Sequence, residues 1–283
     1  MQLFRLIADA LKAFLRHGCA SLAASLAFFS LLSLFPLAFL LLYSISFLAS
    51  QNLGEQFLLS FLKAFLPSLG DDLARELHRI SALESVRWIV SLSCAWFGAL
   101  VFYELDYALN VVFESTWRRH PLISTAISVA LLGATSLLLV VSYVAAQIIL
   151  FLTAYVPNLW GLDLASLAAH DFMLTYTVPF LLAFLTVSLL YRYVPRRPPE
   201  WREAMVGAMA FGILWVAAKL LFVTYSGYAS VYIRLYGSLL EIVMLLLWVY
   251  YSAVLLLLCA AVTHSLQQRA QATASPSSLN DAA

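Results

Sequence analysis

The sequence predicts an all-α membrane protein, a bundle of six transmembrane helices, and three observations support this fold class. The chain of 283 residues is 63% hydrophobic and only 11% charged, and its mean hydropathy is +0.91. This composition lies far outside that of water-soluble domains. Six apolar runs reach the roughly 20 residues that a helix needs to cross a hydrocarbon core of about 30 Å. They are also too long for membrane-barrel strands, which have about ten alternating residues.

The six predicted spans form a single membrane domain, residues 1–265. They cover residues 21–48, 86–103, 122–154, 172–193, 203–225 and 238–263. In lipid the backbone must satisfy its own hydrogen bonds, so each run is predicted to be helical. Residues 266–283 have no apolar period and are predicted to be a disordered cytoplasmic tail. The cysteines are isolated in apolar sequence and are interpreted as packing residues: Cys19, Cys94 and Cys259.

The residues before the first span have the pattern of an amphipathic helix that lies at the membrane surface. Its apolar stripe is Leu3, Ile7, Leu11 and Phe14, and its polar stripe is Arg5, Asp9, Lys12 and Arg16. A cleavable signal peptide is the alternative interpretation. The charged part is too long for one, and the apolar run that follows is about twice the length of a signal core.

The outer loop, residues 50–85, repeats this amphipathic pattern. Its apolar positions are Leu58, Phe61, Leu62 and Phe65, followed by Leu73, Leu77 and Ile80. Pro67 and Gly70 separate the two sets, and both residues are typical helix breakers. The loop is therefore predicted to form two short amphipathic helices on the outer membrane surface.

The positions of Lys and Arg predict that both termini are cytoplasmic. With the N-terminus inside, the inner segments carry ten of these residues: Arg5, Lys12, Arg16, Arg118, Arg119, Arg192, Arg196, Arg197, Arg202 and Arg269. The outer segments carry five: Lys63, Arg75, Arg79, Arg87 and Arg234. Cytoplasmic loops of membrane proteins are enriched in Lys and Arg, so this orientation is favoured.

The stretch FYELDYALNVVFESTWRRH, which follows the second span, brings charged residues into apolar sequence. Glu104 and Asp106 are two positions apart, so a helix points them away from each other and they cannot form a catalytic pair. Asp106 and Asn110 share a helix face. Glu114 can pair with Arg118, four residues further along a helix.

Two interpretations of this stretch remain open. In the first, it extends the second helix, and its polar groups cap and pair where the helix meets water. In the second, Asp106 and Asn110 face a water-filled inner vestibule and contact a substrate or a gate.

Polar groups inside predicted spans are candidates for substrate binding or gating, because they are costly in lipid unless they are paired or face water. The candidates are Lys219, Glu241, Asp106, Asn110, Gln147 and Trp248. Ala204, Ala208 and Gly212 repeat every fourth residue and predict a close-packing seam. Lys219 lies seven residues beyond Gly212, on nearly the same face, so we expect it to point into the bundle. Pro36 predicts a kink in the first span.

Lys219 is predicted to pair with Glu241. If span five ends near Tyr225 and span six begins near Tyr236, the two residues lie about 9 Å and about 7.5 Å below the outer edge. A linking loop of about a dozen residues favours antiparallel neighbours. The alternative is that both side chains reach the outer interface separately.

The sequence lacks the motifs of several kinds of enzyme. It contains no phosphate-binding G-x-x-x-x-G-K-[ST] loop and no G-x-S-x-G nucleophile motif. Its five histidines fall in five different segments without metal-ligand spacing, so no metal or other cofactor is expected. The basic clusters lie at the ends of the predicted spans. Basic side chains there usually contact lipid headgroups, and binding of nucleic acid is not expected.

Three stretches, taken in order, resemble the YihY/BrkB family of bacterial inner-membrane proteins. They are AASLAFFSLLSLFPLAFLLL, LDYALNVVFESTWRR and YGSLLEIVMLLLWVYYSAVLLLLCAAVTH, and AAKLLFVTY precedes the last of them. The resemblance implies a six-span protein of the cytoplasmic membrane. Names used in that family include virulence factor and, by an old misassignment, ribonuclease BN, and some members have been linked to export of lipopolysaccharide precursors. Where the family usually shows Gly-Ala-Glu, this sequence has Cys259-Ala260-Ala261.

Two functions follow from these observations. The first is a transporter or lipid-handling protein that exports or flips an amphipathic or anionic substrate, with membrane lipids as its partners. The second is a non-transporting accessory or scaffold protein, which would hold a second copy or an envelope protein through its outer loop. Neither is an enzyme, and a ribonuclease is not supported because no metal ligands or nucleic-acid-binding domain can be found.

Overall fold

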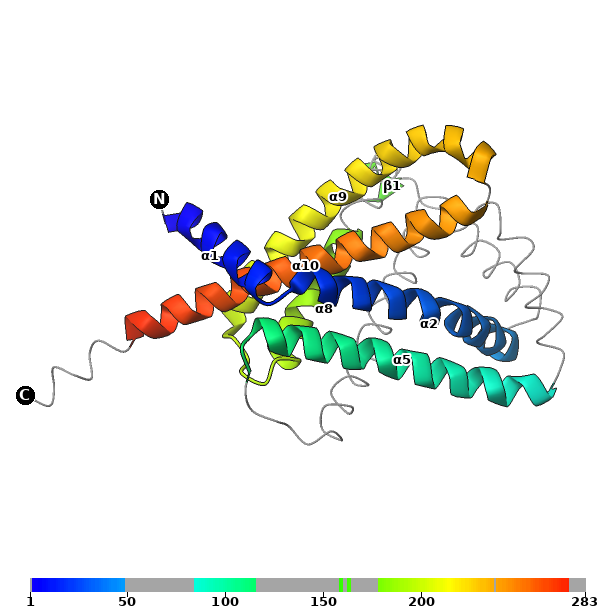
Figure 1. Cartoon of the computed structure of the whole chain (residues 1–283), viewed down its shortest axis with the longest axis horizontal. Helices are drawn as coiled ribbons and strands as arrows, with labels where there is room; N and C mark the ends of the chain where they lie inside the picture. Colours follow the sequence, from blue (N-terminus) through cyan, green and yellow to red (C-terminus); the bar gives the residue numbers. More distant parts are fainter. Residues whose placement is uncertain are drawn as a thin grey trace, which may run out of the picture. The chain divides into compact units, whose positions relative to one another are not determined.

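The computed structural model describes residues 2–48, 84–115, 158–159, 162–163, 178–236 and 238–274 (Figure 1). The helices of this part are α1 (Gln2–Arg16), α2 (Cys19–Leu48), α5 (Glu84–Val112), α8 (Val178–Tyr193), α9 (Trp201–Tyr236) and α10 (Ser238–Ala274). Two short strands, β1 (Asn158–Leu159) and β2 (Leu162–Asp163), pair antiparallel. Apart from this small hairpin, the described chain is helical, as predicted.

Membrane-spanning character is supported by the apolar helices. In the part of the chain that the structure describes, Trp201–Phe222 and Ile242–Gln271 are long and apolar enough to cross a bilayer. A third span is present if the bent pair Ala8–Arg16 and Cys19–Leu34 counts as one. Phe180–Tyr193 is apolar but shorter. The number of six spans stays a prediction, because the run predicted at 122–154 and the outer loop lie outside the described residues.

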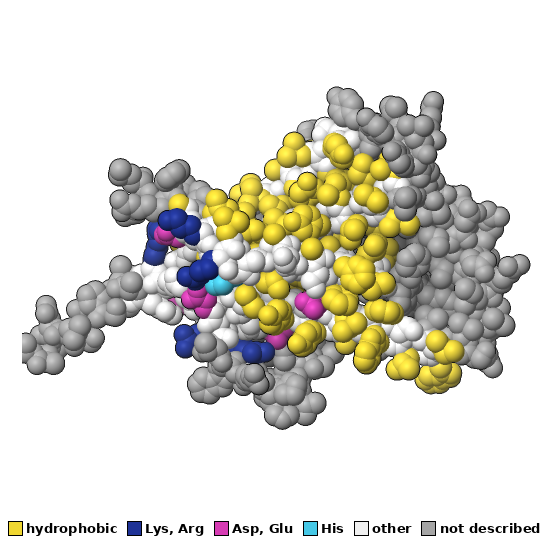
Figure 2. All heavy atoms as spheres, viewed as in Figure 1, with side chains coloured by type: hydrophobic (Ala, Val, Ile, Leu, Met, Phe, Trp, Pro, Cys, Tyr) yellow, Lys and Arg dark blue, Asp and Glu magenta, His cyan; other side chains and the backbone are white. Residues whose placement is uncertain are grey.

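The exposed surface of the helices is largely apolar. Figure 2 shows hydrophobic side chains spread over much of the described face, and charged side chains gathered beside the free end of α10. Large apolar residues stay exposed along one side of α9. They are Met205, Met209, Ile213 and Leu220. Such a surface suits contact with lipid tails rather than with water.

The chain forms two compact units. Unit 1 comprises Met1–His17, Leu109–Ala217 and Leu255–Ala283, and unit 2 comprises Gly18–Ala108 and Ala218–Val254. The helices α5, α9 and α10 therefore each contribute to both units.

Unit 1 has a core built on the small residues of α9. Ala204 and Ala208 are fully buried. A Cβ on Gly207 would overlap the Thr263 hydroxyl of α10, and a Cβ on Gly212 would lie 2.7 Å from the Phe180 ring of α8. These residues let the backbone of α9 approach both neighbouring helices closely, which is how small residues promote helix packing in membranes.

Helix α1 forms where the sequence predicts it. Of the predicted apolar stripe, Phe14 is buried and Leu11 is exposed, while the side chains of Leu3 and Ile7 lie outside the described part. Leu6 and Ala10 are also buried, and Leu15 is exposed. Helix α1 packs as part of unit 1, and this tertiary contact covers Leu6, Ala10 and Phe14.

Two predicted boundaries are wrong. The loop expected after Tyr225 does not exist, because α9 continues to Tyr236 and α10 begins at Ser238. The intervening sequence has no proline to stop a helix. The tail expected to be disordered from 266 is helical up to Ala274, after which the residues are outside the described part.

The extension of α10 is held by tertiary contacts. Gln267 is 9% exposed, and Arg269 Nη2 lies 2.7 Å from Asp9 Oδ2 of α1. The segment is also rich in Gln and Ala, which favour helices. A segment without an apolar period, such as residues 266–274, can therefore be helical when tertiary contacts hold it.

Candidate functional site

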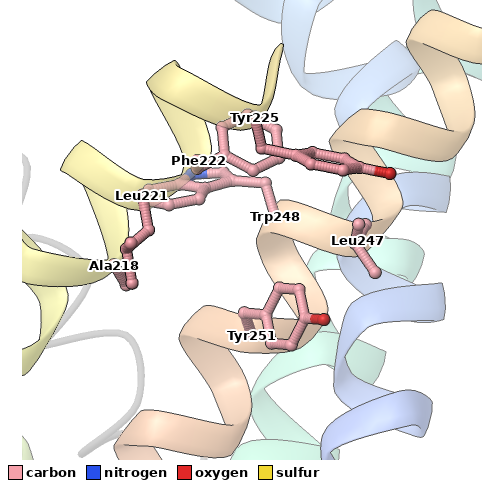
Figure 3. Close-up of a pocket in the computed structure, with 7 residues that line it drawn as sticks. All are labelled: Ala218, Leu221, Phe222, Tyr225, Leu247, Trp248 and Tyr251. Atoms are coloured by element: carbon pink, nitrogen blue, oxygen red, sulfur yellow. The ribbon is translucent and has the colours of Figure 1, made fainter. Parts of the chain in front are cut away.

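An apolar cavity of about 430 Å³ lies between α9 and α10 within unit 2 (Figure 3). Its lining residues are Ala218, Leu221, Phe222 and Tyr225 from α9 and Leu247, Trp248 and Tyr251 from α10. None of them is charged. The volume falls in the range of ligand-binding sites, about 300–1,000 Å³.

The spacing of the lining residues explains how two helices build this wall. Ala218, Leu221, Phe222 and Tyr225 are three or four apart, which places them on one face of α9. One face of α10 likewise carries Leu247, Trp248 and Tyr251. The small side chain of Ala218 leaves space that the larger side chains around it do not fill.

The cavity is open at its rim. Leu221 is 72% exposed, Tyr225 56% and Tyr251 49%. Deeper in the wall, the rings of Phe222 and Trp248 pack with centroids 5.0 Å apart. An apolar wall with an open rim can accept a hydrocarbon group from the side, and the tyrosine hydroxyls can donate hydrogen bonds to a polar group attached to that hydrocarbon.

Of the candidates inside predicted spans, the structure brings Trp248 into this cavity. Lys219 follows the lining residue Ala218 in α9 and is half-buried. Glu241 lies in α10, but its side chain is outside the described part, as is the whole of Gln147. The predicted pair of Lys219 with Glu241 therefore stays a prediction. Pro36 lies within α2, which continues across it, and its side chain is also outside the described part.

Asn110 has a packing role in unit 1. Its side chain is 6% exposed, and its Oδ1 accepts a hydrogen bond of 3.0 Å from the backbone N–H of Arg196. Ser115 Oγ accepts a similar bond of 3.2 Å from the N–H of Arg197. These two bonds hold the α8–α9 connection beside the end of α5. Asp106, one turn earlier, is half-buried.

The α8–α9 connection is further fixed by its own side chains. Arg192 donates to the carbonyl of Pro199, and its guanidinium lies 5.7 Å from the centroid of the Trp201 ring. Glu203 accepts a 2.9 Å bond from the N–H of Glu200, so it caps the start of α9. These contacts fix the conformation of the α8–α9 connection, which carries the basic residues Arg196 and Arg197.

We expect Asn110→Ala to weaken unit 1, because the part-buried N–H of Arg196 loses this acceptor. The cost of leaving such a group unpaired is about 1–3 kcal/mol. Ser115→Ala is the matched control, since the bond it removes is exposed, and it should cost less than about 0.5 kcal/mol. Denaturation of the purified protein in mild detergent measures both. Equal stability of the two variants would contradict the packing role of Asn110.

A polar cluster in unit 1 was not evident from the sequence. Glu114 does not lie on a helix, because α5 ends at Val112 and Glu114 has a positive φ of 48°. Arg118 lies outside the described part. Glu114 pairs with Arg16, and both His17 and His264 lie beside its carboxylate. In the described residues no group of three or more His, Cys, Asp or Glu side chains has the arrangement of a metal site.

Comparison with known proteins identifies the family. The family model described as Virulence factor BrkB matches residues 10–282. The chain belongs to the BrkB family. The resemblance inferred from the sequence motifs is therefore confirmed, and so is the assignment as a membrane protein of this family. No solved structure matches the chain.

The curated relatives of this BrkB family chain are similar over most of its length. A UPF0761 membrane protein from Cronobacter sakazakii is 29% identical over 248 residues, which cover 87% of this chain and 83% of the relative. One from Vibrio vulnificus is 27% identical over 249 residues, covering 87% and 77%. One from Coxiella burnetii is 26% identical over 254 residues, covering 89% and 90%.

Proposed function

We propose that this protein is a lipid-handling transporter of the bacterial inner membrane, which holds the apolar tail of an amphipathic substrate between α9 and α10. The observation that carries the proposal is the cavity with its uncharged lining and exposed rim. A site for a water-soluble substrate would need polar groups to replace the hydration of that substrate. This lining offers two tyrosine hydroxyls and the indole N–H of Trp248, with apolar surface elsewhere.

Access from the side supports a lipid rather than an aqueous solute. Leu221, Tyr225 and Tyr251 expose large parts of their side chains at the rim. In a bilayer, such an apolar surface meets acyl chains. A lipid tail can therefore enter without crossing water, and its affinity comes from contact with the aromatic walls.

Lys219 favours a substrate with an anionic headgroup. It follows the lining residue Ala218 in α9, at the membrane part of that helix. A lysine inside a span is costly unless it is paired or solvated, which makes it a candidate for substrate binding. An anionic headgroup whose tail lies in the cavity would compete with Glu241 for Lys219. The orientation proposed is the one that the Lys and Arg distribution favours, with both termini in the cytoplasm.

Filling the cavity tests the proposal. In the variant Ala218→Phe, a bulky ring replaces the smallest lining side chain, so bound lipid should be lost. Ala217→Phe adds the same ring at an exposed position next to it and is the matched control. Native mass spectrometry of the purified protein measures bound lipid. Liposomes with fluorescent anionic lipids measure movement between leaflets.

We expect Ala218→Phe to lower both lipid occupancy and lipid movement by about tenfold, a loss of about 1.4 kcal/mol in binding. Ala217→Phe should match the wild type. If wild-type protein moves none of several lipids and instead copurifies with a stable protein partner, the accessory or scaffold function replaces this proposal. Equal effects of the two phenylalanines would remove the cavity from the mechanism.

The proposed pair of Lys219 with Glu241 is tested by a double-mutant cycle. Lys219→Met and Glu241→Gln should each reduce stability or lipid movement, because each leaves one charge without its partner. The double variant should recover part of the loss, since neither charge then remains. Strictly additive losses would show that the two side chains act separately.

A further inference from the structure

Glu114 lies at the meeting point of three segments that are far apart in the sequence. Arg16 at the end of α1 pairs with its Oε1. His17 Nε2 lies 3.3 Å from the same oxygen, and His264 Nε2 on α10 lies 3.9 Å from Oε2. All these residues belong to unit 1. One carboxylate therefore joins α1, the turn after α5 and α10.

Both imidazole rings are largely enclosed. The side chain of His17 is 15% exposed and that of His264 is 12% exposed. The ring of Phe113 packs edge-on against His264, with centroids 5.6 Å apart. Gln268, one turn along α10, lies 2.9 Å from His264 Nε2. The second ring nitrogens, His17 Nδ1 and His264 Nδ1, are buried and have no hydrogen-bond partner among the described residues.

These contacts suit neutral rings. A neutral imidazole carries one hydrogen, which can sit on Nε2 and leave Nδ1 bare. For His17 that hydrogen points toward Glu114. For His264, Gln268 Nε2 faces the ring nitrogen at 2.9 Å, and exchanging the nitrogen and oxygen of this amide presents Oε1 as the acceptor of that hydrogen. A second proton would place an N–H at each buried Nδ1, where the described residues provide no acceptor.

The charge count also disfavours protonation in this arrangement. With neutral rings, Arg16 balances Glu114. Two imidazoliums would put three cations around one carboxylate, with Arg197 on the adjoining turn bonded through its N–H to Ser115. The nearby pair of Asp9 and Arg269 is already balanced and offers no spare carboxylate.

We propose that the cluster of Arg16, His17, Glu114 and His264 is an acid-released latch that holds α1 against α10. The closed arrangement binds fewer protons than the open one, so it is favoured at high pH and lost as the pH falls. Histidine is the side chain that changes charge between about pH 5 and 8, which sets the range of the response. Release frees α1, and with it the start of the chain, from unit 1.

Spin labels on α1 and α10 test the latch in the full-length protein in lipid nanodiscs. Lys12 and Gln271 are exposed positions on the two helices, and cysteines there can carry labels once the native cysteines are replaced. Pulsed electron paramagnetic resonance at pH 8 and at pH 5.5 gives the distribution of distances. As the pH falls, the ratio of open to closed protein should rise by up to about tenfold per pH unit through protonation of His264.

The variant His264→Gln separates the latch from other effects of acid. It removes the titrating ring of the cluster, so the distance distribution should not change with pH. Asp9→Asn is the matched control. It removes the other ion pair between the same helices and should loosen α1 at every pH without removing the pH response. The same pH change in wild type and in the His264→Gln variant overturns the proposal, as does a distribution that narrows in acid or does not move.

Discussion

Replacing Gly207 with alanine should destabilise the protein by about 2 kcal/mol, although alanine is the better helix former. The added Cβ would overlap Thr263 Oγ1 and lie 3.2 Å from Thr263 Cβ and 3.3 Å from the Cys259 carbonyl. The last contact is with backbone, which cannot rotate away. Helices α9 and α10 must therefore separate, and their close packing is lost. Reversible unfolding in detergent and bicelles measures the change.

A second substitution identifies the cause of this loss. Thr263→Ala removes the hydroxyl that the new methyl group would meet, so Gly207→Ala with Thr263→Ala should recover part of the stability. Recovery stays partial because the contact with Cys259 remains. Gly98→Ala is the control, since a Cβ there has no neighbour within 4 Å, and its effect should be within about 0.5 kcal/mol. Additive losses from Gly207→Ala and Thr263→Ala would contradict the proposed contact.

Tyr191→Ala is expected to be the most damaging single truncation in unit 1, at about 3–5 kcal/mol. The side chain is fully buried on α8, and its hydroxyl donates a 2.6 Å hydrogen bond to the carbonyl of Leu256 on α10. Alanine leaves a cavity and removes that bond. The ring also packs near Phe113, at 6.5 Å between centroids, so the loss reaches the end of α5.

Two further variants separate packing from hydrogen bonding at this position. Tyr191→Phe keeps the ring and loses only the hydroxyl, so it should cost about 1 kcal/mol. Leu185→Ala is the control on the same helix, because Leu185 is 43% exposed and loses little packing. The same unfolding assay applies. If Tyr191→Phe proves as damaging as Tyr191→Ala, the hydrogen bond rather than the filled volume carries the effect.

The sequence predicted best those features that depend on the residues of a single helix. The length and hydropathy of the apolar runs predicted a helical membrane protein, since lipid leaves the backbone no partner outside its own helix. Three of its motifs also placed the chain in the BrkB family. The four-residue repeat of Ala204, Ala208 and Gly212 marked a close-packing side of α9, and the structure buries the two alanines fully.

Helix ends were harder to predict, because each depends on contacts with residues far along the chain. Arg269 was assigned to a disordered tail from its local sequence, yet its pair with Asp9 belongs to an ordered α10. Asn110 was chosen as a polar residue near a helix end. Its bond to the Arg196 N–H, 86 positions away, could not be read from any spacing.

The sequence by itself determined the class of the protein, its helical content and its family, because composition and periodicity act over one helix at a time. The tertiary structure decided which residues meet in the cavity and in the cluster around Glu114. Trp248 became a cavity residue because α9 places Ala218 and Phe222 opposite it. His17 and His264 stood in separate segments without any common motif, and only packing brought both beside Glu114, since side chains in different helices meet through the fold and not through their spacing.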